Sequence, residues 1–218
     1  MITPETPSRV HFDPDTMETR AFYRVLNSVV VPRPIAWVCS RSAEGVLNLA
    51  PHAFSPVACI DPPVVQFTSV GRKDSLRNVE ATGEFTVSLT PEWLYEQINA
   101  TGTDFPPHVS EAEQSGVALE PSDKVGVPRV AGSPVTVECR LHSTVRLGDS
   151  TVVFGRVLHI SAWESAVRDG RPRIEDLKPL ARLGGNEWST IGEVKVIPRI
   201  PYKNWVDDPS IGDRLRGE

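Results

Sequence analysis

Long hydrophobic runs are missing from this sequence of 218 residues. No apolar segment approaches the roughly 20 residues that a membrane-spanning helix needs, and residues 1–20 lack the apolar core of a secretion signal. Basic runs are missing too, and the net charge of −5 argues against wrapping of nucleic acid. We therefore expect a cytoplasmic protein that has neither a membrane nor a nucleic acid as a partner.

Cysteine is also scarce. Cys39, Cys59 and Cys139 are odd in number, widely spaced and set in apolar stretches, so packing as small hydrophobic residues explains them better than disulfides or metal ligation. The five histidines show no HExxH spacing, and paired CxxC motifs are missing. We predict no metal site. GxSxG, P-loop and post-strand GxGxxG motifs are lacking as well, which disfavours hydrolase, nucleotide-triphosphatase and Rossmann functions.

The β signals that are present dominate the centre of the chain. Segments rich in Val, Ile, Phe and Thr, separated by Gly, Pro and Asp, predict strands at 28–40, 63–70, 84–89, 135–147 and 151–163. The turn Leu147-Gly148-Asp149-Ser150 joins the last two in a long hairpin. With 39% hydrophobic residues the chain can bury a real core. We divide it into an N-terminal arm (1–19), one domain (20–196) and an extended C-terminal arm (197–218).

Helical signals are fewer. The sequence predicts helices over 17–26 and 74–81, and a third that starts at Thr90 with Pro91 in its first turn. The stretch 102–134 mixes Pro, Gly, Ser and acidic residues around a short helix at 110–115 and predicts a lid-like excursion.

The segment Arg33–Ser55 is the strongest candidate for ligand binding. It joins a buried strand to a second strand through a turn at Glu44-Gly45. Pro51 interrupts that second strand, which restricts it to an edge or a bulge. His52 could contact a ligand ring or substrate, and a purely structural role is an equal alternative.

A second cluster, Gly71–Asn78, follows a strand and opens a predicted helix. The helix start supplies unpaired N–H groups, and Lys73 and Ser75 add a cation and a hydroxyl, so a phosphate would fit. The alternative is that Asp74 or Ser75 only caps the helix while Arg72 and Lys73 are solvated.

A third cluster, Leu177–Trp188, places two glycines beside Arg182. Arg182 could pair with an anionic group and Trp188 could cover a planar ligand. The alternative is a helix that ends at Gly184 in a C-cap.

Together these clusters resemble the flavin reductase-like family of FMN-binding split barrels. The segments that carry the resemblance are VVPRPIAWVCS, GVLNLAPHAFSPVACIDPPVVQFTS, GRKDSLRNVEATGEFTVSLT and PLARLGGNEW, in that order over residues 20–195. The resemblance implies a mainly β fold, namely a six-stranded Greek-key split β-barrel with helical caps. It also implies a homodimer that holds FMN in a groove near the subunit interface.

Carried over residue by residue, the resemblance implies a set of flavin contacts. The cofactor-binding residues would be Trp37, Val38, Cys39, Ser40, Asn48, Leu49, Ala50, Pro51, His52, Ser55, Lys73, Asp74, Ser75, Asn78, Arg182, Gly184, Gly185 and Trp188. Ser75 stands where relatives often carry Thr, and Trp188 where many carry Tyr. The first change keeps a hydroxyl and the second loses one.

The implied function is that of an FMN-dependent oxidoreductase in which the flavin N5 accepts hydride and no side chain is catalytic. NAD(P)H is a candidate electron donor, but relatives that use it often have His where this chain has Ser150. FAD in place of FMN stays open. The alternative function is a non-catalytic flavin-binding protein that carries electrons or stores cofactor.

Overall fold

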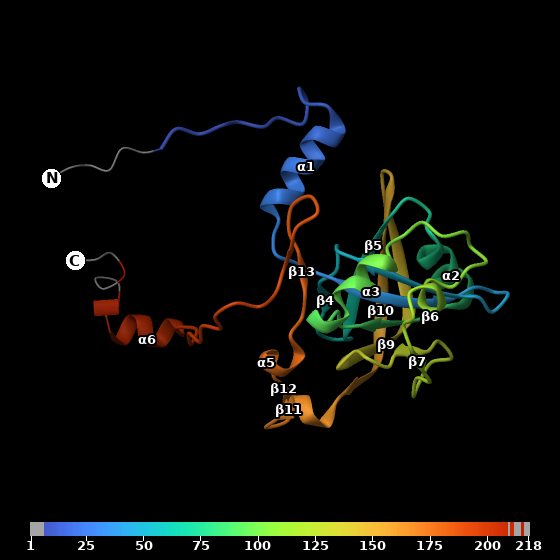
Figure 1. Cartoon of the computed structure of the whole chain (residues 1–218). Coiled ribbons are helices and arrows are strands. Elements are labelled where there is room, and N and C mark those ends of the chain that lie inside the picture. Colours follow the sequence, from blue (N-terminus) through green and yellow to red (C-terminus); the bar gives the residue numbers. More distant parts are fainter. Residues whose placement is uncertain (1–6, 209, 212–214, 216–218) are drawn as a thin grey trace.

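An antiparallel sheet of seven strands forms the centre of the molecule (Figure 1). The computed structural model describes residues 7–208, 210, 211 and 215. The strands lie in the order β3-β2-β6-β9-β10-β5-β4. Their bounds are β2 Ala36–Arg41, β3 Leu47–His52, β4 Val57–Cys59, β5 Val64–Val70, β6 Glu84–Ser88, β9 Val135–Leu147 and β10 Ser150–Ala162. The strands expected at 63–70, 84–89, 135–147 and 151–163 agree with these bounds to within one residue.

The first and last strands of this sheet, β3 and β4, are successive parts of one bent segment. β3 pairs with β2, whereas β4 pairs with β5. Between them, the N–H of Thr68 donates to the carbonyl of Phe54 at 3.0 Å, and the N–H of Gln66 donates to that of Pro56 at 3.1 Å. The same segment thus serves both edges of a strongly curved sheet. Counted as one strand, it gives the six strands that the resemblance implied.

Both faces of β2 are buried, and successive side chains of the strand point alternately into two separate cores. Val38 points into a cluster with Phe67, Phe85 and Val153, which come from three other strands of the curved sheet. Trp37 and its neighbours on the opposite face join a second cluster beneath the helices and the 102–134 excursion. A strand covered on both sides reads as a continuous apolar run, which explains the sequence AWVC.

Helix α1 (Thr19–Val29) projects from the sheet (Figure 1). It corrects two expectations, because the predicted helix ended at residue 26 and a strand was predicted from Ser28. The β-branched residues after Asn27 suggested a strand, but the helix continues to Val29. Glu18 accepts a hydrogen bond from the N–H of Ala21 at 2.9 Å and caps the start of the helix.

Helix α2 (Asp74–Thr82) follows β5 directly and packs Leu76 and Val79 into the cluster around Val38. After β6, a 3-10 turn η1 (Glu92–Leu94) leads into α3 (Tyr95–Ala100), so the expected third helix begins two residues late. The other short elements are β1 Arg33–Pro34, α4 Glu111–Gln114, β7 Leu119–Glu120, β8 Arg129–Val130, η2 Glu164–Ala166, β11 Val167–Arg168, β12 Arg171–Pro172, α5 Ile174–Leu177, β13 Ala181–Arg182 and β14 Trp188–Ser189.

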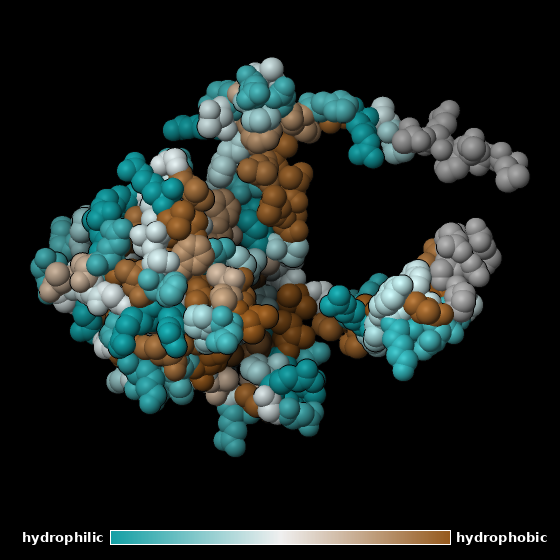
Figure 2. Space-filling model, turned by 180° about the vertical axis from the view of Figure 1, so that it is seen from behind, coloured by the Kyte–Doolittle hydropathy of each residue, from teal (hydrophilic) through white to brown (hydrophobic). Residues whose placement is uncertain are grey.

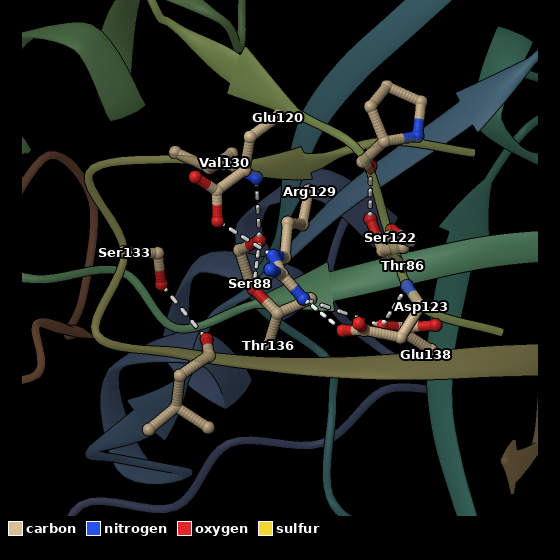
Figure 3. A network of polar contacts seen from close by, with 12 residues as sticks. Thr86, Ser88, Glu120, Ser122, Asp123, Arg129, Val130, Ser133, Thr136 and Glu138 are labelled. Carbon is tan, nitrogen blue, oxygen red and sulfur yellow. Dashed lines mark hydrogen bonds and ion pairs between the residues drawn. The ribbon is translucent and has the colours of Figure 1, made fainter. Parts of the chain in front are cut away.

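Most of the 102–134 excursion packs against the sheet. Its anchor is the fully buried Glu138 on β9, whose carboxylate accepts from the N–H groups of Asp123 at 3.0 Å and Lys124 at 2.6 Å. Arg129 bonds to Asp123 at 2.5 Å and lies 3.7 Å from Glu138 (Figure 3). His159 comes close to the same carboxylates. Because the guanidinium of Arg129 already supplies positive charge there, we read this cluster as a structural clamp.

The chain beyond β14 leaves the body of the molecule and ends in helix α6 (Tyr202–Asp207) (Figure 1). Residues 190–201 have no regular structure, although only 197–201 of them belong to the expected arm, and α6 was not expected. The expected arms also include residues 1–6, 209, 212–214 and 216–218, which lie outside the described part. The division of the chain into arms and one domain stays a prediction. Among the described residues, no helix has the length and apolar character needed to cross a membrane.

Candidate functional site

A cavity of about 400 Å³ opens beside β3, between the start of α2 and the end of α1. A volume of this size suits a small organic ligand. The residues around it are Tyr23, Arg24, Asn27, Arg33, Asn48, Ala50, Pro51, His52, Ala53, Phe54, Thr68, Val70, Lys73, Asp74, Ser75, Thr101, Gly102, Thr103, Asp104, Phe105, Glu111, Arg182 and Gly185. They come from segments far apart in the sequence, which only the folded chain brings together.

The start of α2 forms one wall of this cavity. Lys73 is the N-cap residue and makes no side-chain hydrogen bond to the helix. The N–H groups of the first turn therefore lack intrahelical partners and carry partial positive charge. The alternative of a simple cap by Asp74 or Ser75 is wrong, since Asp74 pairs with Arg77 and the Ser75 hydroxyl bonds to residues of β3. The side chains of Arg72 and Lys73 are largely exposed, as that alternative expected, and they pair with Glu80 and Asp104, respectively.

His52 and Ser75 form the centre of a directed chain of hydrogen bonds. The Nδ1 atom of His52 lies 3.3 Å from the carbonyl oxygen of Thr68, and Nε2 lies 3.0 Å from the Ser75 hydroxyl. A carbonyl only accepts, so Nδ1 donates and the other nitrogen accepts from Ser75. The side-chain amide of Asn48 donates to the same hydroxyl at 3.1 Å. Burial lowers the pKa of His52 to about 4, which keeps the ring neutral near pH 7.

The carboxylates around the cavity already have partners. Asp74 and Asp104 pair with Arg77 and Lys73, respectively. Glu111 is buried and accepts from the N–H of Leu49 at 2.9 Å. Burial raises the pKa of the Glu111 carboxyl, and the bond to Leu49 offsets part of that increase.

The opposite end of the cavity contains arginines. Arg33 is buried and donates to the carbonyls of Asn27, Val30 and Leu183, which fastens the end of α1 to the β13–β14 hairpin. Arg182 donates to the carbonyl of Gly185 at 2.8 Å, and its guanidinium lies 4.6 Å from the centre of the Trp188 ring. This end is therefore built from the third sequence cluster.

The alternative C-cap at Gly184 is wrong. Helix α5 already ends at Leu177, and Lys178 after it takes the left-handed conformation. Gly184 lies instead in the turn between β13 and β14, where a Cβ atom would lie 2.6 Å from the hydroxyl oxygen of Ser28. Glycine is needed at this position because the turn packs against α1.

The predicted site residues fall into two groups. Asn48, Ala50, Pro51, His52, Lys73, Asp74, Ser75, Arg182 and Gly185 border the cavity, whereas Trp37, Val38, Cys39, Ser40, Leu49, Ser55, Asn78, Gly184 and Trp188 do not. Trp188 borders a smaller neighbouring cavity that shares Arg182 and Pro51. The flavin contacts assigned to both groups stay predictions.

Several residues of the second group are buried and form hydrogen bonds away from the cavity lining or to its wall at Thr101. Trp37 is buried and donates from Nε1 to the hydroxyl of Thr101 at 2.9 Å, and Asn78 donates to the Ser40 hydroxyl at 3.2 Å. Burial raises the pKa of Cys39 to about 12, so this thiol is inert near neutrality. Cys39 and Cys139 are buried as expected, but Cys59 is exposed, which corrects that part of the prediction.

Sequence reasoning missed the walls contributed by α1 and by the segment Thr101–Phe105. Tyr23, Arg24 and Asn27 recur at helical spacing and share one face of α1. That spacing could have marked them as a group, but not as neighbours of β3. The run Thr-Gly-Thr-Asp at 101–104 has the small and hydroxyl residues common in binding loops.

Known proteins resemble this chain in sequence and in fold. The model of the flavin reductase like domain matches residues 28–176. The chain belongs to this family. An uncharacterized protein of Deinococcus radiodurans is 37% identical over 91% of this chain and 93% of the relative.

Two solved structures share the family's fold with this chain. Nitrilotriacetate monooxygenase component B from Bacillus cereus has a TM-score of 0.85 at 30% identity, covering 88% of this chain and 100% of that one. The 2-nitrobenzoate 2-nitroreductase NbaA from Pseudomonas fluorescens has a TM-score of 0.81 at 29% identity, covering 88% and 96%. The predicted family and the predicted fold class are confirmed.

Proposed function

We propose that this chain binds FMN in the cavity beside β3 and acts as an oxidoreductase. The observation that carries the proposal is the uncapped start of α2, which opens into the cavity next to Lys73 and Ser75. Such a helix start suits a phosphate, since unpaired N–H groups and the helix dipole both favour an anion.

The remaining lining also fits a flavin. Ala50, Pro51 and Val70 offer an apolar bed, while Asn48 offers polar atoms for a ring edge. Proline within β3 leaves backbone groups that a regular strand would bond to a neighbour. FMN suits the cavity of about 400 Å³ better than FAD, because FAD adds an adenosine monophosphate that needs further space.

Bound FMN would supply hydride or electron transfer at its N5 atom. The residues of this chain bind and orient the cofactor and exclude water. His52 is neutral and already bonded on both nitrogens, so it fits a positioning role better than proton transfer.

The family and the names of its relatives support redox chemistry, since a monooxygenase component and a nitroreductase share this fold. A non-catalytic carrier or store of flavin is the second candidate. It is favoured by Ser150 in the β9–β10 turn, where the hydroxyl bonds to Asp149 at 2.8 Å and the His of nicotinamide-dependent relatives is lacking.

We further propose that the chain forms a homodimer in the cytoplasm. Large apolar side chains are exposed at the end of α1 and on the segment beyond β14, among them Val29, Val30, Val196 and Ile197. Hydrophobic surface gathers between α1 and the body and at the base of the C-terminal arm (Figure 2).

An anaerobic titration separates the two candidate functions. The purified protein loaded with FMN is mixed with NADH or NADPH, and the flavin absorbance is followed. Rapid bleaching supports a nicotinamide-dependent enzyme, while no bleaching with either nucleotide rejects it and favours the carrier. Failure of the protein to take up FMN rejects both candidates.

The phosphate wall is tested with a pair of variants. Lys73→Ala combined with Ser75→Ala removes a cation and a hydroxyl from the start of α2, so FMN binding falls by about 100-fold, while riboflavin, which lacks the phosphate, loses much less. Fluorescence quenching measures both affinities. Arg72→Ala is the matched control, because Arg72 pairs with Glu80 at 2.7 Å on the outer side of the helix. An equal loss for both ligands would contradict the phosphate assignment.

A further inference from the structure

Two arginines stand directly opposite each other at the far end of the cavity. β1 and β13 are antiparallel, and their register pairs Arg33 with Arg182. Opposite residues of an antiparallel pair extend to the same side, and like charges in this arrangement repel each other. A third cation, Arg24 of α1, also borders the cavity.

No carboxylate of the described residues forms an ion pair with any of these three arginines. Arg33 and Arg182 bond only to backbone carbonyls, and the Nε atom of Arg33 is buried without a partner. Burial lowers the pKa of Arg33, Tyr23 raises it, and the charge of Arg182 lowers it further. Several other arginines of the described chain pair with acids, among them Arg77, Arg129 and Arg173.

This positive end is separate from the start of α2. Arg33 lies over the Phe54 ring at 5.8 Å, beyond the C-terminal end of β3, whereas Ser75 bonds to Asn48 and His52 within the strand. The three acids that border the cavity have partners other than these arginines. A phosphate at the start of α2 would therefore leave the charge of the arginine end uncompensated.

We propose that Arg24 and Arg182, with Arg33 behind them, form a second anion subsite that binds the carboxylate or phosphate of the small molecule exchanging electrons with the flavin. The identity of that molecule as a redox partner rests on the proposed function. The charge of the arginines and the register that pairs them do not depend on that function. Guanidinium groups suit this task because their forked donors match both kinds of oxyanion.

The test compares pairs of ligands of which one member carries an anionic group and the other does not. Calorimetric titrations at low salt use benzoate against benzamide for a carboxylate, and AMP against adenosine for a phosphate. The protein contains added FMN, and the FMN affinity of each variant is measured separately by fluorescence. Failure to bind FMN would thus count against the proposed function alone, while the charge preference remains measurable.

The native protein is expected to bind one anionic ligand about tenfold more tightly than its neutral counterpart. Arg24→Gln combined with Arg182→Gln should remove this preference. Arg20→Gln, one turn earlier on α1 and away from the cavity, should keep it. Arg33 is left in place because it fastens α1 to the β13–β14 hairpin. Thermal melting checks that each variant is folded.

The pair of ligands that shows the preference identifies the anion as a carboxylate or a phosphate. If the native protein binds the anionic and the neutral member of each pair equally well, the proposal is overturned. A preference that survives in the double arginine variant, or that Arg20→Gln abolishes as well, would also overturn it.

Discussion

At the scale of single residues, the direction of the hydrogen bonds around His52 determines its protonation state. His52, Ser75 and Asn48 have one consistent arrangement of hydrogens, and it requires a neutral imidazole. In that arrangement the Ser75 hydroxyl donates its hydrogen bond to Nε2 of His52. A phosphate at this wall would compete for it, so the N–H groups of α2 and the Lys73 ammonium should supply most of the phosphate binding.

The stability of the fold should therefore depend on the charge of His52. Its pKa of about 4 in the folded protein lies below the ordinary 6.5 because the ring is buried. Between these values the unfolded chain binds a proton that the folded chain does not. The stabilisation is complete above pH 6.5 and is lost as the pH falls toward 4, by about 3 kcal/mol.

Urea unfolding at pH 7, 5.5 and 4.5 measures this loss. His52→Gln should show a flatter dependence of unfolding free energy on pH, while His142→Gln, on the exposed part of β9, should follow the native protein. An unchanged slope in His52→Gln would reject the assignment.

At the scale of elements, one glycine permits the curvature of the sheet. Gly155 lies beside an irregularity in the pairing of β9 and β10. A Cβ atom there would lie 2.2 Å from Cζ of Phe85 and 3.1 Å from Cβ of Cys139, both of which are buried. Phe85 thus fills the space that a side chain at position 155 would take.

Gly155→Ala should lower the unfolding free energy by about 2 kcal/mol, since the Phe85 ring would have to move within a packed core. Denaturant unfolding measures the change. Gly192→Ala is the control, because no heavy atom lies within 4 Å of the Cβ atom it would add. Equal stability of the two variants would show that the interior yields more easily than these distances imply.

At the scale of the whole molecule, the segment beyond β14 carries apolar residues that are exposed within the described part of the chain. Val196 is 90% exposed and Ile197 is 88% exposed, in a segment that leaves the body before α6 (Figure 1). Water contact at such residues is unfavourable, and a second copy of the chain is the partner we propose for them.

Val196→Ser combined with Ile197→Ser should therefore weaken the dimer at least tenfold, because the apolar area buried on association is lost. Light scattering across a dilution series measures the dissociation constant. Lys195→Ser changes a neighbouring exposed residue and should leave it unchanged. A native protein that is monomeric at all concentrations would reject the dimer, and an unaltered constant in the double variant would remove the arm from its interface.

The sequence by itself determined the elements whose signals are local. Alternation predicted β9 and β10, Gly-Asp chemistry predicted the turn between them, and a strand followed by Gly and Lys predicted the start of α2. These patterns depend on neighbours within a few residues, so no tertiary information is needed. The four segments that carried the family resemblance need no tertiary information either, because the resemblance depends on their residue types and on their order along the chain.

Only the tertiary structure decided which side chains face the cavity. Trp37 and Cys39 belong to the same motif as Asn48, yet they pack on a side of β2 that α3 and the 102–134 excursion cover. Arg33 and Arg182 are 149 positions apart and meet only through the pairing of β1 with β13. Burial on both faces of a strand and pairing across such distances leave no periodic trace in the sequence, so the fold must be known before the site can be.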